Sequence, residues 1–232
     1  MPIVRVNDIN MYYEIHGEGE PVTLIAGLNS DHTLYRGILP HLAARYQVIL
    51  FDNRGVGQTD KPDIPYTIEM MAADTAGLLQ VLGIERAHIL GTSMGGRIAV
   101  ALALQHPQQA KSLILVSTVV KSLKQVPRSW SRRLLDLQLK IPAVRGRNPY
   151  YAVARQLEAS RSYDAMDRLH EIQVPTLILH GKKDTIAPYW LAEEMHAGIK
   201  NSQMVTFSGG HLFFIFEQKP FLEAILTFWA SL

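Results

Sequence analysis

The residues best suited to chemistry lie in residues 91–95, which read Gly-Thr-Ser-Met-Gly and directly follow an apolar run. A serine on a sharp turn between a strand and a helix adopts a strained backbone conformation, so only small residues fit two positions before and after it. Gly91 and Gly95 supply that room. This context predicts that Ser93 is a nucleophile. The alternative interpretation is a glycine-rich turn that is needed only for close packing of a strand against a helix.

A serine nucleophile needs a base, and the base needs a carboxylate to orient it. Asp184 follows one predicted strand, and His211 follows a double glycine after the next. Both come after Ser93 in the order Ser, Asp, His that a serine on this kind of turn requires. Asp184 could instead serve only as a turn residue before Pro188. We predict that Ser93, Asp184 and His211 form a catalytic triad.

The tetrahedral intermediate of acyl transfer needs two N–H donors for its oxyanion. Met94 directly follows the predicted nucleophile, and Leu28 lies in the loop after the first buried strand pattern. We predict that both donate through their backbone N–H groups. The apolar and aromatic side chains predicted to line the substrate site are Trp130, Tyr150, Tyr151, Ile186 and Leu212.

Short aliphatic runs alternate with helical patterns along most of the chain. The runs are continuous, which is typical of parallel strands that are covered on both faces. We predict an α/β fold with a doubly wound, mostly parallel, eight-stranded sheet. The predicted strands are 3–9 and 11–15 as an antiparallel entry pair, then 22–26, 48–51, 87–90, 113–116, 176–179 and 204–207; the predicted helices include 68–82, 94–105 and 221–229.

Residues 119–173 break this alternation and differ in charge from the rest of the chain. Residues 119–168 hold eleven Lys or Arg and four Asp or Glu, a net charge of +7. Helical patterns such as 128–139 predict a small helical lid inserted into a core of residues 1–118 and 174–232. The basic side chains have two interpretations: they form the solvated faces of lid helices, or an arginine binds an anionic substrate.

Composition excludes several classes of protein. The chain has 232 residues, of which 47% are hydrophobic, and it contains no cysteine. Disulfides, thiolate metal sites and a cysteine nucleophile are therefore excluded. A net charge of +2 gives no case for nucleic-acid binding. No apolar run reaches the length of a membrane span or a signal core, so we expect a cytoplasmic protein. No signal indicates a metal, an organic cofactor or a particular oligomeric state.

The same features resemble the α/β-hydrolase fold family along essentially the whole chain. Residues 52–59 read Asp-Asn-Arg-Gly-Val-Gly-Gln-Thr and are similar to a D-x-R-G-x-G-x-S/T stretch whose role in that family is structural. Many relatives carry His-Gly before the oxyanion residue, whereas this chain has Ala26-Gly27, as in some enol-lactonase relatives. A serine at 93 argues against the dehalogenase and epoxide-hydrolase branches. Asn29 stands where haloperoxidase or perhydrolase relatives often have proline.

This resemblance implies a serine hydrolase that cleaves carboxylic esters or lactones through an acyl-enzyme. A small lid favours short or medium acyl groups on a small-molecule substrate. Two other functions use the same triad: hydrolysis of a carbon–carbon bond, and a receptor or signalling protein that slowly hydrolyses its ligand.

Overall fold

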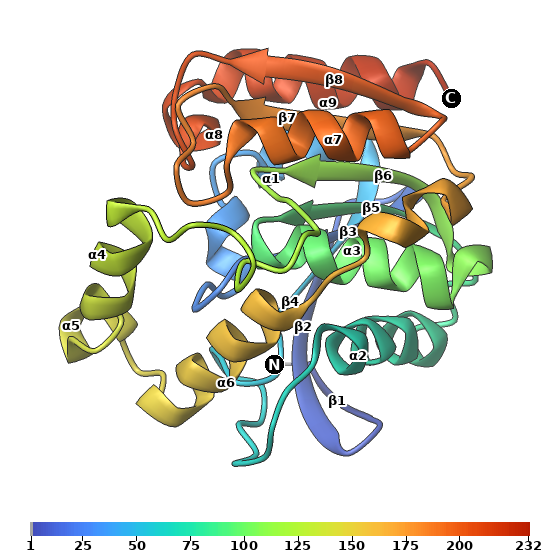
Figure 1. The fold of residues 1–232 in the computed structure, drawn as a ribbon. Coiled ribbons are helices and arrows are strands. Elements are labelled where there is room, and N and C mark those ends of the chain that lie inside the picture. The colour runs from blue at the N-terminus through green and yellow to red at the C-terminus, as the bar shows by residue number, and fades with distance from the viewer. Residues whose placement is uncertain (1) are drawn as a thin grey trace.

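The computed structural model describes residues 2–232, which form an eight-stranded sheet between two layers of helices (Figure 1). The strand order is β1-β2-β4-β3-β5-β6-β7-β8. The β1–β2 and β2–β4 pairs are antiparallel and every other pair is parallel, which confirms the predicted fold class and the antiparallel entry. The predicted bounds of the entry pair are wrong, because the turn lies between Val6 and Ile9 and not at Asn10. The strands are β1 (Ile3–Val6), β2 (Ile9–His16), β3 (Glu20–Ile25), β4 (Tyr46–Phe51), β5 (Ala87–Thr92), β6 (Ala110–Val116), β7 (Thr176–Gly181) and β8 (Ser202–Phe207).

Two hydrophobic cores fill the spaces between the sheet and its helices. One core contains residues of α2 (Ile68–Val81), α3 (Met94–Gln105) and α7 (Tyr189–Gly198). The other contains residues of α1 (Leu39–Ala43), α8 (Phe213–Phe216) and α9 (Gln218–Ala230). Short 3₁₀ helices span His32–Tyr35, Pro107–Gln109 and Met166–Glu171.

The central strands contribute to both cores because successive side chains point to opposite faces of a sheet. In β5, Ile89 packs into the core with α3, whereas Leu90 packs into the core with α9. All six residues of β5 are buried. This two-sided burial is the physical reason why the strands read as unbroken aliphatic runs in the sequence.

Helix α3 spans the predicted residues, and α2 begins at the predicted residue and ends at Val81, one residue before the predicted end. The Thr67 side chain accepts a hydrogen bond from the Met70 N–H and caps α2, and Gly83 follows it with a positive φ of 69°. Ten of the twelve residues of α3 are buried, as expected of a helix that is apolar nearly all round, and Pro107 follows its end. α3 therefore lies against the sheet as a fixed support for the turn at its N-terminus.

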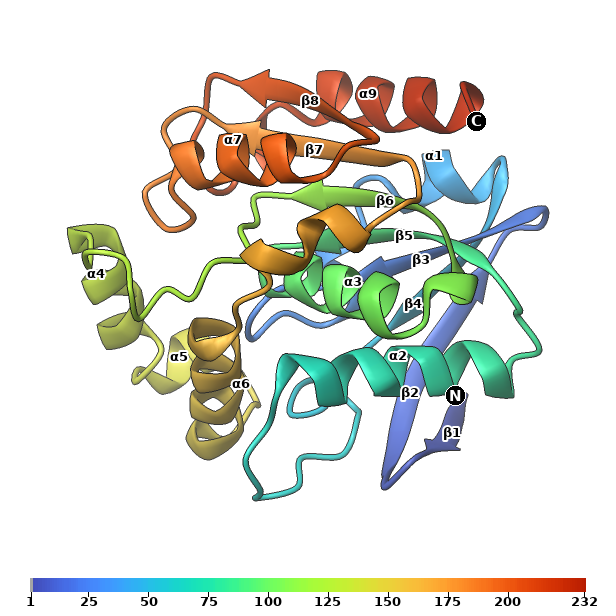
Figure 2. The same ribbon diagram turned by 45° about the vertical axis from the view of Figure 1, so that its right-hand side comes forward.

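The 119–173 segment carries α4 (Trp130–Gln138), α5 (Pro142–Arg145) and α6 (Tyr150–Ser162). These helices lie beyond the end of the sheet to which the arrowheads of β6 and β8 point, as both ribbon views show (Figures 1 and 2). Helix α4 falls within the predicted helix 128–139. Arg97 of α3 joins the start of the segment to the residue after α6: its buried side chain donates to the Lys121 carbonyl at 3.3 Å and the Tyr163 carbonyl at 3.1 Å. Burial lowers the pKa of Arg97 to about 10, which leaves it charged at pH 7.

Within residues 2–232, no helix combines the length and the apolar character that a membrane crossing needs.

The stretch at residues 52–59 stabilises the fold through a buried ion pair. The Arg54 Nε donates to Asp74 Oδ2 at 2.5 Å and its Nη2 to Asp74 Oδ1 at 2.8 Å. The side chains of Arg54 and Asp74 are 1% and 2% exposed. Arg54 also pairs with the more exposed Asp8. The loop after β4 is thereby tied to α2.

We expect Asp74→Asn to lower the free energy of unfolding by about 3–5 kcal/mol, because it leaves a buried guanidinium without its main counter-charge. The matched control, Asp8→Asn, removes a pair whose carboxylate is 55% exposed and should cost about 1 kcal/mol or less. Urea unfolding of the wild type and the two variants measures both changes in unfolding free energy. Equal effects of the two substitutions would contradict this ranking.

Candidate active site

The turn between β5 and α3 forces Ser93 into an unusual backbone conformation, with φ of 55° and ψ of −114°. A Cβ atom on Gly91 would lie 2.2 Å from the Gly95 carbonyl oxygen, and one on Gly95 would lie 2.0 Å from the Ile25 carbonyl oxygen. Glycine is therefore required at both positions. The Ser93 N–H donates to the Val116 carbonyl at 2.8 Å, which holds the turn against β6.

The side chains of Ser93, His211 and Asp184 form a continuous hydrogen-bonded chain. The His211 Nε2 lies 3.0 Å from the Ser93 Oγ, and the His211 Nδ1 lies 2.7 Å from the Asp184 Oδ2. The Asp184 side chain is fully buried, whereas that of His211 is 14% exposed. A hydroxyl bonded to an imidazole that a buried carboxylate orients is the arrangement that allows a serine to attack a carbonyl carbon.

Asp184 also stabilises its own loop. Its Oδ1 accepts hydrogen bonds from the Ile186 and Ala187 N–H groups, both at 2.9 Å. The turn interpretation and the triad interpretation of Asp184 therefore describe different oxygens of one carboxylate. Oδ1 shapes the turn, and Oδ2 faces His211.

Ser117, directly after β6, binds the backbone of the triad histidine, a contact that the sequence does not predict. Its Oγ donates to the His211 carbonyl at 2.7 Å, and its φ is 47°. The one signal in the sequence is a serine directly after an aliphatic strand, which is too common to predict this contact.

The loop that carries Leu28 lies directly against the serine turn. A Cβ atom on Gly27 would lie 3.4 Å from the Ser93 Cβ. The Ser30 N–H donates to the Gly27 carbonyl at 3.2 Å, and Asn29 has a positive φ of 58°, as in a type II turn. No hydrogen bond among residues 2–232 uses the Leu28 N–H.

Met94 supplies a second N–H beside Ser93. As the first residue of α3 it has no acceptor for its N–H within the helix. The strand that leads into the Leu28 loop is fixed by two further hydrogen bonds, from the Asn53 Nδ2 to the Ala26 carbonyl at 3.1 Å and from the Tyr35 hydroxyl to the Ile25 carbonyl at 2.8 Å. Two backbone donors are thus held near one hydroxyl.

The five side chains predicted to line the substrate site lie in three places: beside the triad, on α4 and on α6. Leu212 adjoins His211 and is 49% exposed, and Ile186 contacts Asp184 through its backbone. Trp130 is 74% exposed on α4. Tyr150 and Tyr151 lie on α6 along a hollow of about 310 Å³ that none of the three triad residues lines. The roles of all five remain predictions.

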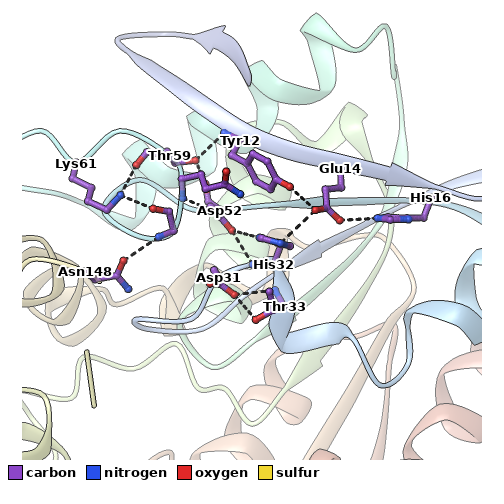
Figure 3. Close-up of polar contacts among 12 residues, drawn as sticks. Tyr12, Glu14, His16, Asp31, His32, Thr33, Asp52, Thr59, Lys61 and Asn148 are labelled. Atoms are coloured by element: carbon purple, nitrogen blue, oxygen red, sulfur yellow. Dashed lines mark hydrogen bonds and ion pairs between the residues drawn. The ribbon is translucent and has the colours of Figure 1, made fainter. Parts of the chain in front are cut away.

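Three side chains that could bind a metal ion lie close together, and two of them directly follow the Leu28 loop in the sequence. The ligand atoms of Asp31, His32 and Asp52 lie within 4.8 Å of one another, close enough to hold a metal ion. Each already has a protein partner (Figure 3). Asp31 accepts from the Thr33 N–H at 3.0 Å, and the Asp52 Oδ1 accepts from the His32 N–H at 2.8 Å and lies 2.7 Å from its Nδ1. These contacts fix the loop that follows β3.

The chain belongs to the alpha/beta hydrolase fold family. The model of that family matches residues 20–150, and a model described as serine hydrolase (FSH1) matches residues 86–224.

Individual relatives have hydrolase descriptions. The chain is 28% identical to "Putative carbamate hydrolase RutD" of Azorhizobium caulinodans, over 98% of each chain. An esterase from Exiguobacterium antarcticum is 26% identical with a TM-score of 0.87, over 97% of this chain and 98% of the esterase. An enol-lactonase from Burkholderia xenovorans LB400 is 24% identical with a TM-score of 0.86, over 99% and 100%, and shows the shared fold.

His180 lies beside the triad carboxylate and makes the stability of the site sensitive to acid. Its Nε2 is 2.9 Å from the Ala187 carbonyl and 3.4 Å from the Asp184 Oδ2, and its buried Nδ1 has no hydrogen-bond partner in the described part of the chain. Burial lowers the pKa of His180 below the ordinary value of 6.5. The unfolded chain therefore binds this proton more readily than the folded one.

The contribution of neutral His180 to stability is fully present above pH 6.5 and is lost as the pH falls below that value. We expect His180→Gln to reduce the loss of unfolding free energy between pH 7.5 and pH 5.5, because glutamine keeps a donor but does not titrate. Urea unfolding at the two pH values measures this. The control His41→Gln replaces an exposed histidine and should keep the wild-type loss of unfolding free energy between the two pH values. An identical response of the two variants would argue against this role of His180.

Proposed function

We propose that this protein hydrolyses carboxylic esters or lactones through an acyl-enzyme. The observation that carries the proposal is the continuous Ser93–His211–Asp184 hydrogen-bond chain beside two backbone N–H groups, of Leu28 and Met94, that have no acceptor among residues 2–232. Membership of the alpha/beta hydrolase fold family supports hydrolysis in general. The esterase and carbamate hydrolase descriptions of two relatives support attack on a carbonyl carbon.

In the first step His211 Nε2 accepts the proton of Ser93 as its Oγ attacks the ester carbonyl. Asp184 keeps the Nδ1 proton in place and stabilises the imidazolium that forms. The carbonyl oxygen becomes an oxyanion that accepts hydrogen bonds from the Leu28 and Met94 N–H groups. One such donor contributes about 3–4 kcal/mol to transition-state stabilisation. His211 then protonates the leaving alkoxide.

In the second step a water molecule replaces the alcohol. His211 removes a proton from this water, which attacks the acyl carbon and regenerates the free Ser93 hydroxyl with release of the carboxylic acid. For a lactone, the leaving alkoxide remains attached to the acyl group, so ring opening gives one hydroxy acid. Neither step calls on a group beyond the residues named and water.

We further propose that residues 119–173 form a lid over a core of residues 1–118 and 174–232, and that the substrate is a small neutral molecule with a short or medium acyl group. Six of the eleven basic side chains in this segment pair with acidic side chains, which favours the solvated interpretation over an anion-binding one. The pairs are Lys121–Glu194, Lys124–Glu158, Arg128–Asp136, Arg155–Asp63, Arg161–Asp136 and Arg168–Glu171.

We expect Ser93→Ala to lower kcat for p-nitrophenyl acetate and butyrate by a factor on the order of 10⁴ or more, because the attacking oxygen is lost. Steady-state assays of purified protein measure this. Ser160→Ala makes the same change on α6 and should keep wild-type turnover. A wild-type protein without multiple turnover would be a binding protein rather than an enzyme, and full activity of Ser93→Ala would remove Ser93 as the nucleophile.

A substrate panel tests which bond is cleaved. We expect kcat/KM for phenyl acetate and for a five-membered lactone to exceed that for the matching phenyl carbamate, because the carbamate nitrogen donates electron density and makes the carbonyl less electrophilic. A vinylogous diketone should not be cleaved. A preference for the carbamate would reassign the substrate class, and cleavage of the diketone would point to carbon–carbon bond hydrolysis.

A further inference from the structure

The loop that presents the Leu28 N–H is bound by side chains of the 119–173 segment. The Asn29 N–H donates to the Gln156 Oε1 at 3.0 Å, and the Gln156 Nε2 donates to the Arg54 carbonyl at 2.8 Å. Gln156 lies on α6 and is fully buried. One side chain of the segment therefore joins the Leu28 loop to the loop after β4.

A second side chain makes a parallel connection. The Asn148 Nδ2 donates to the Asn29 Oδ1 at 2.9 Å, and the Asn148 Oδ1 accepts from the Gly57 N–H at 3.0 Å. Figure 3 shows Asn148 directed toward the loop that carries Thr59 and Lys61. The Asn29 Nδ2 also donates to the Val144 carbonyl at 3.3 Å. The segment thus contacts both the backbone and the side chain of Asn29.

The loop after β4, which receives these contacts, is itself fixed. The Asp52 Oδ2 accepts from the Gln58 N–H at 2.8 Å, and a Cβ atom on Gly57 would lie 2.0 Å from this same Oδ2. The Thr59 Oγ1 donates to the Asp52 carbonyl at 2.7 Å. Gln156 and Asn148 therefore brace the Leu28 loop against a rigid support.

Leu28 and Asn29 are the central residues of one tight turn, so contacts that hold Asn29 also restrain the adjoining Gly27–Leu28 peptide, which carries the Leu28 N–H. A non-glycine residue with a φ of 58° adopts a conformation that most side chains disfavour. Without the hydrogen bonds from Gln156 and Asn148 to Asn29, this strained turn could relax, and the Leu28 N–H in the adjoining Gly27–Leu28 peptide would move with it.

We propose that Gln156 and Asn148 are positioning residues that hold the Leu28 loop in the conformation that stabilises the oxyanion. The contacts between the 119–173 segment and this loop then affect the rate of the chemical step. This inference rests on the proposed function. It assigns the segment a part in transition-state stabilisation in addition to covering the substrate. Neither side chain contacts the reacting atoms.

The test is Gln156→Leu, which keeps the approximate volume of the side chain and removes both hydrogen bonds. Displacement of an oxyanion donor affects the transition state more than the bound substrate. We expect kcat for p-nitrophenyl acetate to fall about 10- to 100-fold with KM within about twofold of wild type. The affinity for phenylboronic acid, whose tetrahedral serine adduct resembles the intermediate, should weaken by a similar factor.

The matched control is Gln138→Leu, which makes the same change at an exposed position of α4 and should leave both constants at wild-type values. A role in stability alone would lower the unfolding free energy but leave kcat of the folded enzyme unchanged, and that result overturns the inference. An increase in KM with unchanged kcat also overturns it.

If Gln156→Leu does not fold, Asn148→Ala tests the second connection, with a smaller fall in kcat expected and an unchanged kcat contradicting the proposal. The wild type is measured in parallel. A wild type without Ser93-dependent turnover overturns the proposed function together with this inference, whereas turnover in the wild type and in both variants at equal kcat overturns the inference alone.

Discussion

The structure depends on the close approach of three backbone segments at the turn that carries Ser93. Here β5 ends, α3 begins, and the β3 strand passes so near that a methyl group at Gly95 would overlap the Ile25 carbonyl. This contact places the hydroxyl, the helix N-terminus and the loop after β3 within reach of one another. The strain at Ser93 is tolerated because α3 is buried along nearly its whole length and because β6 accepts the Ser93 N–H.

The other parts of the candidate site follow from the parallel sheet. Parallel strands end at one edge, so the loops after β6, β7 and β8 bring Ser117, Asp184 and His211 to the turn after β5. These residues also hold the loops in place: the Ser117 Oγ donates to the His211 carbonyl, and the Asp184 Oδ1 accepts from the Ile186 N–H. The side-chain geometry is thus determined by the same hydrogen bonds that order the loops.

The fold and the members of the candidate triad could be predicted because their signals are local. Unbroken aliphatic runs mark strands that are buried on both faces, and Gly91 and Gly95 mark a turn with no room for Cβ atoms. The contacts of Gln156 and Ser117 could not be predicted in this way. Gln156 reads as a polar residue on an amphipathic helix, and its partners Asn29 and Arg54 are more than 100 positions away in the chain. Helix α8, with four residues, is too short to show a period.

The hydrogen bonds from Arg97 to Lys121 and Tyr163 have a consequence for how such proteins diversify. Since one guanidinium binds both carbonyls, residues 121 and 163 lie close together, and the chain between them leaves and returns at a single place beside α3. A replacement of different length could span the same two points without altering the register of any strand. If Gln156 positions the Leu28 loop as proposed, an exchanged segment would also have to supply an amide for Asn29. A segment chosen for shape alone would then fold but give slow turnover, so two demands limit which segments can be grafted onto the sheet.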